Sequence, residues 1–210
     1  MGRMLRSVCA LGVKMSAVYD KLKRLYLKLV GYGDQRRYWD TRWGIDLNRS
    51  LDRSIDKATF DHAFKITSEI MKKLDCNNIL EIGCGKAEFR TLPNYTPLDF
   101  SKKVLNKYGL EGFVYADITN RIPLPDKTFD CAMTRYVLMH IPTDKIENAV
   151  KEISRVTKRA FITTETCNSP LPLKSHCFNH DLKALFQKHF SGKLVSIDEK
   201  TWAVTVEDLT

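Results

Sequence analysis

The segment Ile79-Leu80-Glu81-Ile82-Gly83-Cys84-Gly85-Lys86-Ala87 decides the fold of this chain. Its first four residues form a short, mainly apolar run typical of a buried strand, and the glycines that follow indicate a tight turn. In an open sheet of parallel strands, ligands bind beyond the carboxyl ends of the strands, and the first turn approaches them closely. Glycine permits this approach because it lacks Cβ. A lone Gly-x-Gly turn is equally typical of a turn without a ligand, so the neighbouring sequence must separate the two interpretations.

Strands and helices alternate on both sides of this segment. Apolar residues at helical spacing predict a helix over 57–74, and strands and helices follow in turn. The strands are expected at 95–98, 113–116, 131–137 and 160–164, and the helices at 102–108, 145–157 and 181–190. Two final strands, 193–198 and 202–206, indicate an antiparallel hairpin. We therefore predict an α/β fold with a doubly wound, Rossmann-like, mostly parallel seven-stranded sheet and a C-terminal antiparallel hairpin at its edge.

Positive charge is concentrated near the N-terminus. The 210 residues include 34 Lys+Arg and 25 Asp+Glu, a formal net charge of +9. Residues 1–42 hold 10 Lys/Arg and 3 Asp/Glu, so the rest of the chain is nearly neutral. We predict a basic helical arm or lid over 1–45 and a single domain over 46–210. The amphipathic helix expected at 17–30 can dock on the domain or lie on an anionic membrane surface.

The distribution of cysteines and the N-terminal residues indicate the cellular compartment of the protein. The six cysteines are scattered without a CxxC pair, which favours free thiols in a reducing, cytoplasmic compartment. The apolar run 8–13 is too short for a signal peptide and Lys14 follows it. Met15 is an alternative start. No apolar run approaches the roughly 20 residues of a transmembrane helix.

Acidic residues close three successive strands of the predicted sheet. Glu81 precedes the first turn, Asp99 follows the second strand and Asp117 follows the third. A carboxylate at the second position can accept hydrogen bonds from both hydroxyls of a ribose, and one at the third from an adenine amino group. Ile118 can pack on the adenine ring. Negative charge beside the first turn disfavours a pyrophosphate and suits a sulfonium.

With these residues in place, the chain resembles the class I S-adenosylmethionine-dependent methyltransferases, in particular the methyltransferase-11/25-like group that acts on small molecules. The similarity covers roughly residues 77–166 through motifs and extends to 210 through the order of elements. It is carried by the segments 81–85, 98–101, 116–118, 122–130 and 135–142. It implies S-adenosylmethionine as cofactor, held by Glu81, Gly83, Cys84, Gly85, Asp99, Phe100, Asp117, Ile118, Thr134 and Arg135.

The chain departs from the family pattern at two places. Ala87 replaces the third glycine of the first motif, a change that the family often accommodates. The stretch from Gly83 to Asp99 is shorter than usual, so we expect an abbreviated first crossover helix.

Catalytic candidates lie beyond the fourth and fifth strands. Methyl transfer needs alignment and exclusion of water, and a hydroxyl acceptor also needs a base. His140 is the candidate base, although a capping or packing histidine fits the same pattern. Tyr136 either contacts substrate or packs, and Glu165 either orients an amine or is a solvated loop residue.

The arm and a late loop supply candidate substrate contacts. Tyr38, Trp39, Arg42 and Trp43 can close over the site as a lid, and the same mixture of aromatic and basic residues can stack on nucleic-acid bases. His176 and His180 belong to a loop expected to face the substrate. Together with Cys167 and Cys177 they also suggest zinc, but His176 and Cys177 are adjacent, which hinders binding of one ion by both. We expect no metal.

The resemblance implies transfer of a methyl group to an N or O atom, with a small molecule as the expected partner. Protein, nucleic acid and a non-catalytic domain that binds S-adenosylmethionine remain alternatives, and the basic arm leaves contact with nucleic acid or a membrane surface open. A nicotinamide-dependent oxidoreductase is the alternative from another class. Its fingerprint requires Gly or Ala at the sixth position, where this chain has Glu88.

Overall fold

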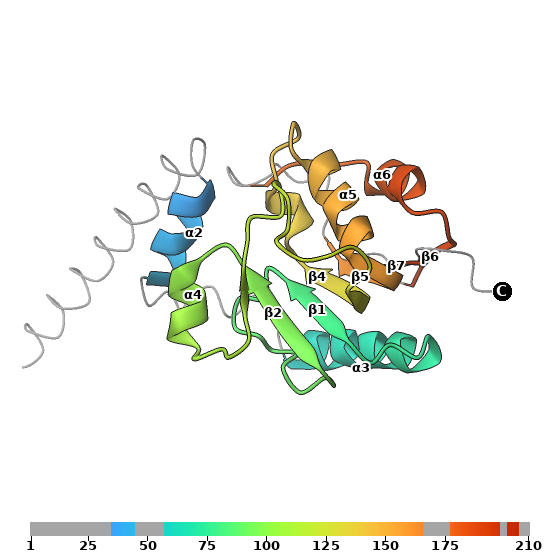
Figure 1. The fold of residues 1–210 in the computed structure, drawn as a ribbon, viewed down its shortest axis with the longest axis horizontal. Helices are drawn as coiled ribbons and strands as arrows, with labels where there is room; N and C mark the ends of the chain where they lie inside the picture. The colour runs from blue at the N-terminus through green and yellow to red at the C-terminus, as the bar shows by residue number, and fades with distance from the viewer. Residues whose placement is uncertain (1–34, 45–56, 166–176, 198–200, 206–210) are drawn as a thin grey trace, which may run out of the picture.

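Seven strands form one sheet in the order β3-β2-β1-β4-β5-β7-β6. The computed structural model describes residues 35–44, 57–165, 177–197 and 201–205 (Figure 1). The strands are β1 (Ile79–Ile82), β2 (Tyr95–Asp99), β3 (Val114–Tyr115), β4 (Phe129–Arg135), β5 (Thr157–Thr164), β6 (Leu194–Ser196) and β7 (Thr201–Thr205). The helices are α2 (Gln35–Gly44), α3 (Lys57–Lys73), α4 (Lys102–Lys107), the 3-10 turn η3 (Leu138–His140), α5 (Ile146–Val156) and α6 (Leu182–His189). The predicted doubly wound α/β fold is confirmed, whereas the helix expected at 17–30 lies outside the described residues.

The C-terminal strands form the predicted hairpin, with one difference in placement. Strand β7 is antiparallel to both β5 and β6, whereas β1 to β5 pair in parallel. Because β7 is inserted between its partners, the edge strand β6 runs in the same direction as the parallel strands. Burial explains the order: Thr201 and Val204 of β7 are buried, while Val195 and Ser196 of β6 are exposed.

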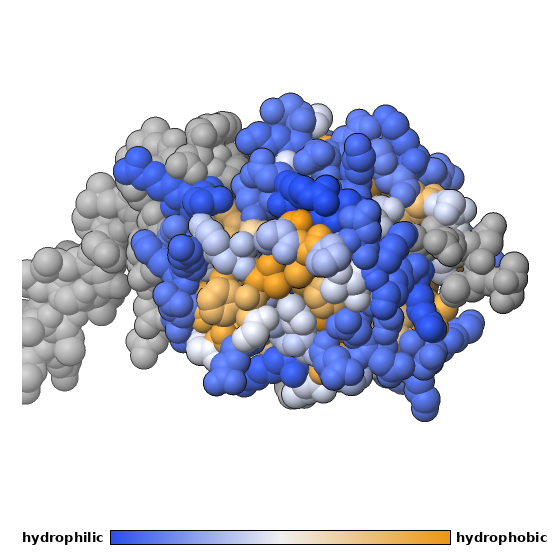
Figure 2. Space-filling model, viewed as in Figure 1, coloured by the Kyte–Doolittle hydropathy of each residue, from blue (hydrophilic) through white to orange (hydrophobic). Residues whose placement is uncertain are grey.

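Both faces of the sheet are covered by helices, as a parallel sheet requires. On one face Leu80 and Ile82 pack in a cluster that includes the apolar sides of α5 and α6. On the other face Ile79 and Met133 pack against α3. Figure 2 shows apolar side chains in the middle of the viewed face, over the strands, with hydrophilic side chains around them. None of the described helices has the length and apolar character needed to cross a membrane.

The first crossover differs most from the usual pattern. Residues 83–94 form turns with no helix between β1 and β2, so the expected abbreviation is complete. Phe89 fills the space that the buried side chains of such a helix would occupy. It is almost fully buried, and its ring stacks on that of Phe64 of α3 with 5.4 Å between the ring centroids. This turn segment leads directly from the glycine turn to β2.

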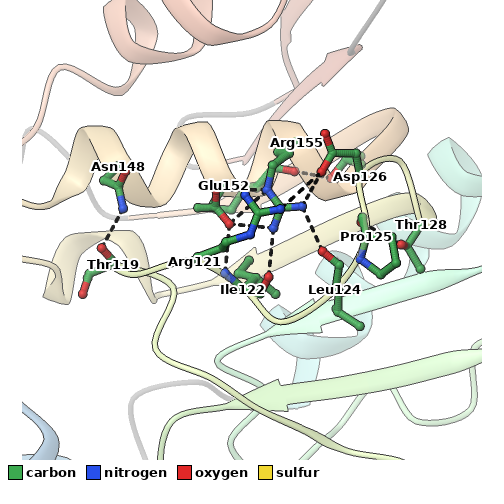
Figure 3. A network of polar contacts seen from close by, with 12 residues as sticks. Thr119, Arg121, Ile122, Leu124, Pro125, Asp126, Thr128, Asn148, Glu152 and Arg155 are labelled. Carbon is green, nitrogen blue, oxygen red and sulfur yellow. Dashed lines mark hydrogen bonds and ion pairs between the residues drawn. The ribbon is translucent and has the colours of Figure 1, made fainter.

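A polar network attaches the segment between β3 and β4 to α5 (Figure 3). Arg155 donates to the carbonyls of Ile122 and Leu124 at 2.9 Å each, to Asp126 at 2.6 Å and to Glu152 at 2.7 Å. Glu152 in turn accepts the backbone N–H of Ile122 at 2.9 Å. The Arg155 guanidinium keeps the pKa of Glu152 below its ordinary value. The network therefore fixes the chain that follows Asp117.

We predict that Arg155→Ala lowers the free energy of unfolding by about 2–4 kcal/mol, because it leaves a nearly buried carboxylate and two carbonyls without their donor. Urea unfolding followed by circular dichroism measures the change. Arg121→Ala is the matched control, since Arg121 is exposed and its nitrogen is 4.0 Å from Asp126; its effect should stay below about 0.5 kcal/mol. Equal effects of the two variants would contradict a structural role for the network.

Candidate cofactor-binding site

The parallel register brings the predicted cofactor residues to one edge of the sheet. Ile82 is opposite Leu98 on one side and Thr134 on the other, and Leu98 is opposite Val114. The residues that follow these positions are therefore neighbours. They are Gly83 after β1, Asp99 at the end of β2, Tyr115 at the end of β3 and Arg135 at the end of β4.

The glycine turn is shaped by its packing as well as by its backbone angles. Gly83 has a φ of +65°, and a Cβ there would lie 2.6 Å from Cγ2 of Val137. The N–H groups of Gly83 and Cys84 donate to the Leu98 carbonyl at 2.8 and 3.1 Å. Ala87, at the third-glycine position, has a φ of 52° and is fully buried. Gly83 is thus required by contact with the turn after β4, a reason that the sequence alone did not reveal.

Asp99 connects the glycine turn to the start of α4. Its two carboxylate oxygens accept from the backbone N–H of Gly85 at 3.2 Å and of Ser101 at 2.9 Å. Burial raises the pKa of Asp99, and these backbone hydrogen bonds oppose the shift. Each carboxylate oxygen can accept a second hydrogen bond, so the group retains acceptor capacity for a ribose diol. Phe100 next to it is half-buried.

Asp117 is held by its own turn. Its Oδ1 accepts from the N–H and the hydroxyl of Thr119 at 3.0 and 2.7 Å, while its Oδ2 is 3.9 Å from a guanidinium nitrogen of Arg36. Ile118 beside it is 7% exposed. A half-buried carboxylate next to an apolar side chain suits an aromatic ring that carries an amino group. The donor and acceptor types of Asp99, Asp117 and Ile118 therefore fit an adenosine.

Glu81 is a buried acid with a tyrosine partner. It is 3% exposed, and the Tyr95 hydroxyl donates to its Oε2. Burial raises the pKa of Glu81 to about 7, although Tyr95 and the charge of Arg135 act in the opposite direction. Sequence reasoning missed Tyr95. The contact depends on the register of β1 and β2, in which Pro97 is opposite Glu81 and Tyr95 is the diagonal neighbour on the same face.

Helix α2 contacts α4 and the carboxyl edge of the sheet (Figure 1). Asp40 accepts from the Ser101 hydroxyl at 2.5 Å, and Arg36 donates to the Tyr115 hydroxyl at 2.9 Å. Trp39 approaches His140 edge-on, with 4.8 Å between the ring centroids. Tyr38 is buried, while Arg42 and Trp43 belong to the helix but their side chains lie outside the described residues. Within the basic helical arm or lid predicted over 1–45, the sequence analysis expects a helix at 17–30 but not the helix found at Gln35–Gly44.

Glu165 holds the turn that follows β4. Its Oε1 accepts from the N–H of Val137 at 3.1 Å and of Leu138 at 3.0 Å, and its Oε2 accepts from Met139 at 3.3 Å. It also accepts from the hydroxyls of Thr134 and Thr163, and it is 2% exposed. Tyr136 begins the turn with a φ of 54°, a strained value for a residue other than glycine. The carboxylate therefore acts on the backbone that carries His140.

The two described histidine candidates lie in different environments. His140 Nδ1 is 3.7 Å from the Cys177 sulfur, and both side chains are half-buried. His180 is buried and donates through Nε2 to the Ile141 carbonyl at 2.9 Å, and burial lowers its pKa. Cys167 and His176 lie outside the described residues. Within the described ranges, no three His, Cys, Asp or Glu side chains lie close enough together to hold a metal ion.

A surface hollow of about 450 Å³ lies at the opposite edge of the sheet, beside the ends of α5 and α6. None of the candidate residues contributes to it. It is lined by Lys127, Ser154, Gln187, Lys188, His189, Phe190 and Ser191.

Comparison with known proteins agrees with this geometry. Residues 80–160 match a family model described as a methyltransferase domain. The resemblance to class I methyltransferases that the motifs indicate is therefore confirmed. A search of curated proteins found no match to the chain.

Solved structures share the fold of this chain at low sequence identity. PH0226 from Pyrococcus horikoshii OT3 is 15% identical with a TM-score of 0.57, covering 72% of this chain and 92% of its own. Magnesium protoporphyrin IX methyltransferase (ChlM) from Synechocystis PCC 6803, with bound SAH, is 12% identical with a TM-score of 0.61, covering 81% and 96%. YcgJ from Bacillus subtilis is 20% identical with a TM-score of 0.52, covering 66% and 71%.

Glu81 predicts a pH dependence of stability. Between its ordinary pKa of 4.5 and about 7, the folded state retains a proton that the unfolded state has released. The free energy of unfolding of the wild type should therefore fall as the pH rises through this window, by a total of about 3 kcal/mol. Glu81→Gln lacks this titration. We predict that the stability difference, variant minus wild type, increases from about pH 4.5 to about pH 7.5, measured by urea unfolding. A difference independent of pH would contradict the raised pKa.

Proposed function

We propose that this protein is an S-adenosylmethionine-dependent methyltransferase that methylates an N or O atom of a small molecule. The observation that carries the proposal is the placement of Asp99 and Asp117 at the ends of adjacent parallel strands, beside the Gly83–Gly85 turn of a methyltransferase domain. The two carboxylates are hydrogen-bond acceptors, and their order along the sheet edge matches the order of the donors in an adenosine, which are the ribose hydroxyls and the adenine amino group. Structures of ChlM with SAH and with SAM add support at the level of the fold.

The proposed cofactor contacts follow the order of the strands. Asp99 would accept from the ribose hydroxyls and Asp117 from the adenine amino group, with Ile118 against the ring. The Gly83–Gly85 turn would pass under the ligand. Above its pKa of about 7, Glu81 would place negative charge close to a sulfonium, which stabilises a nearby cation.

The bound cofactor would supply a methyl group already activated by a sulfonium. The protein then has to align the acceptor and exclude water. Trp39, whose ring lies 4.8 Å from the ring of His140, would restrict the access of water beyond β4. His140, in the turn that Glu165 fixes, is the proposed base for a hydroxyl acceptor. An amine acceptor would need only to reach the site unprotonated.

A small-molecule acceptor remains the preferred substrate class. The chain beyond residue 42 is nearly neutral, which gives a nucleic acid little electrostatic attraction outside the arm. The sequence also has neither the Asn/Asp-Pro-Pro-aromatic motif nor the Pro-Cys pair of nucleic-acid methyltransferases. A cytoplasmic location is part of the proposal, because the four described cysteines are free thiols and suit a reducing compartment.

The adenosine assignment predicts the effect of a substitution at Asp117. Asp117→Ala should weaken binding of S-adenosylmethionine and S-adenosylhomocysteine by about 1–3 kcal/mol, since it removes a charged acceptor from the adenine amino group. Isothermal titration calorimetry measures both affinities. Asp144→Ala is the control, because Asp144 is exposed and lies before α5. Unchanged affinity in Asp117→Ala, or binding of a dinucleotide in place of these ligands, would refute the assignment.

The acceptor class can be tested without knowing the acceptor. Incubating the protein and a cell extract with cofactor labelled on the methyl group should place the label in the small-molecule fraction. Label in protein, RNA or DNA would instead support the alternative substrate classes. The fraction that acquires label then provides the compound to identify.

A further inference from the structure

Arg135 and Glu88 form an ion pair across the proposed cofactor site. Arg135 is the last residue of β4, and Glu88 lies in the turn segment after β1. The Nη2 of Arg135 contacts Oε2 of Glu88, and the two side chains are 13% and 39% exposed. A nearly buried guanidinium is therefore paired with a carboxylate that remains open to solvent.

Packing fixes the guanidinium beside the glycine turn. Its Cζ lies 5.5 Å from the centre of the Phe89 ring, which supports one face of the group. The pairing of Ile82 with Thr134 makes Gly83 and Arg135 neighbours at the sheet edge. Such a planar cation, which stays charged at any accessible pH, is suited to bidentate recognition of a carboxylate.

The proposed cofactor places a carboxylate in this direction. An adenosine held by Asp117 and Asp99 lies over the ends of β3 and β2, so the tail attached to its 5′ position continues over β1 toward β4. In S-adenosylmethionine that tail is an amino acid with a free carboxylate. We propose that Arg135 binds this carboxylate and that Glu88 is an internal competitor, which occupies Arg135 until the ligand displaces it. The inference rests on the proposed function.

Glu88 is the carboxylate at this edge that can leave most readily. Glu81 is buried with Tyr95, and Asp99 accepts from two backbone N–H groups. Glu88 is exposed and lies on a segment without helical structure, so water can solvate it after release. Exposed ion pairs contribute little to stability, whereas a carboxylate enclosed with Arg135 gains a stronger charge-assisted interaction. The exchange therefore favours the ligand.

The test compares two thioether ligands that share the adenosine and differ in the amino-acid tail: S-adenosylhomocysteine and 5′-methylthioadenosine. We expect Glu88→Gln and Glu88→Ala to raise the affinity for S-adenosylhomocysteine about two- to fivefold, the equivalent of a lost competing ion pair. Arg135→Met should lower that affinity about tenfold or more. None of the three substitutions should change the affinity for 5′-methylthioadenosine. Isothermal titration calorimetry measures these affinities, and the weaker ligand is measured by its competition with the stronger one.

A matched control separates competition from a general effect of charge. Glu69→Gln on α3 removes an equal charge from an exposed position away from the site and should leave both affinities unchanged. For the cationic S-adenosylmethionine, loss of a nearby negative charge would by itself weaken binding. Tighter binding of this ligand to Glu88→Gln therefore supports competition.

Three results would overturn the inference. Weaker or unchanged binding of S-adenosylhomocysteine to both Glu88 variants would show that Glu88 does not compete and would leave the proposed function intact. An equal loss of affinity for S-adenosylhomocysteine and 5′-methylthioadenosine in Arg135→Met would show that Arg135 supports the folded site and does not bind the carboxylate. If the wild type binds 5′-methylthioadenosine and neither ligand with an amino-acid tail, or binds none of the three, the proposed function fails together with the inference.

Discussion

The contact between Gly83 and Val137 is the constraint on which the site depends. It joins the turn after β1 to the turn after β4, and there is no space for a Cβ between them, since the nearest methyl carbon would lie 2.6 Å away. Gly83 also takes a positive φ, so two independent requirements select glycine at this position. With the two turns in contact, the residues that follow β1 and β4 share one surface. This is why the glycine turn, Arg135 and the His140 turn belong to a single site.

Buried carboxylates fix the segments on either side of this contact. Glu165 binds three consecutive N–H groups of the turn that carries Val137, and Asp99 binds the N–H groups of Gly85 and Ser101. Both side chains therefore hold the backbone of the segments that form the candidate site. Ser101 continues the connection outward, because its hydroxyl donates to Asp40 of α2. Asp99, Ser101 and Asp40 therefore connect the end of β2 to α2 through consecutive hydrogen bonds.

The sequence predicted the framework of the site better than its internal contacts. Strand ends and glycine positions follow from local patterns, so the sequence predicts Asp99, Asp117 and the Gly83–Gly85 turn at one edge of the sheet. Partners distant along the chain could not be found in this way. Tyr95 beside Glu81 depends on the register of β1 and β2, and the Phe89–Phe64 stack depends on the missing crossover helix. The role of Glu165 could not be predicted from the sequence, because a carboxylate that follows a strand can be either buried or solvated. Only the fold shows that this one is buried.

The order of charges along the sheet edge links the fold to the proposed ligand. Following β3, β2, β1 and β4, the edge presents Asp117, then Asp99, then the turn beside Glu81, and finally Arg135. The proposed cofactor carries, in the same order, an amino donor, a diol, a sulfonium and a carboxylate. A dinucleotide would instead place its pyrophosphate next to Glu81 and Asp99, and its negative charge would oppose the ionised forms of these carboxyl groups, whose pKa values burial already raises. The sequence of three acceptors followed by one cation therefore distinguishes the two ligand classes more sharply than the glycine turn, which both can use.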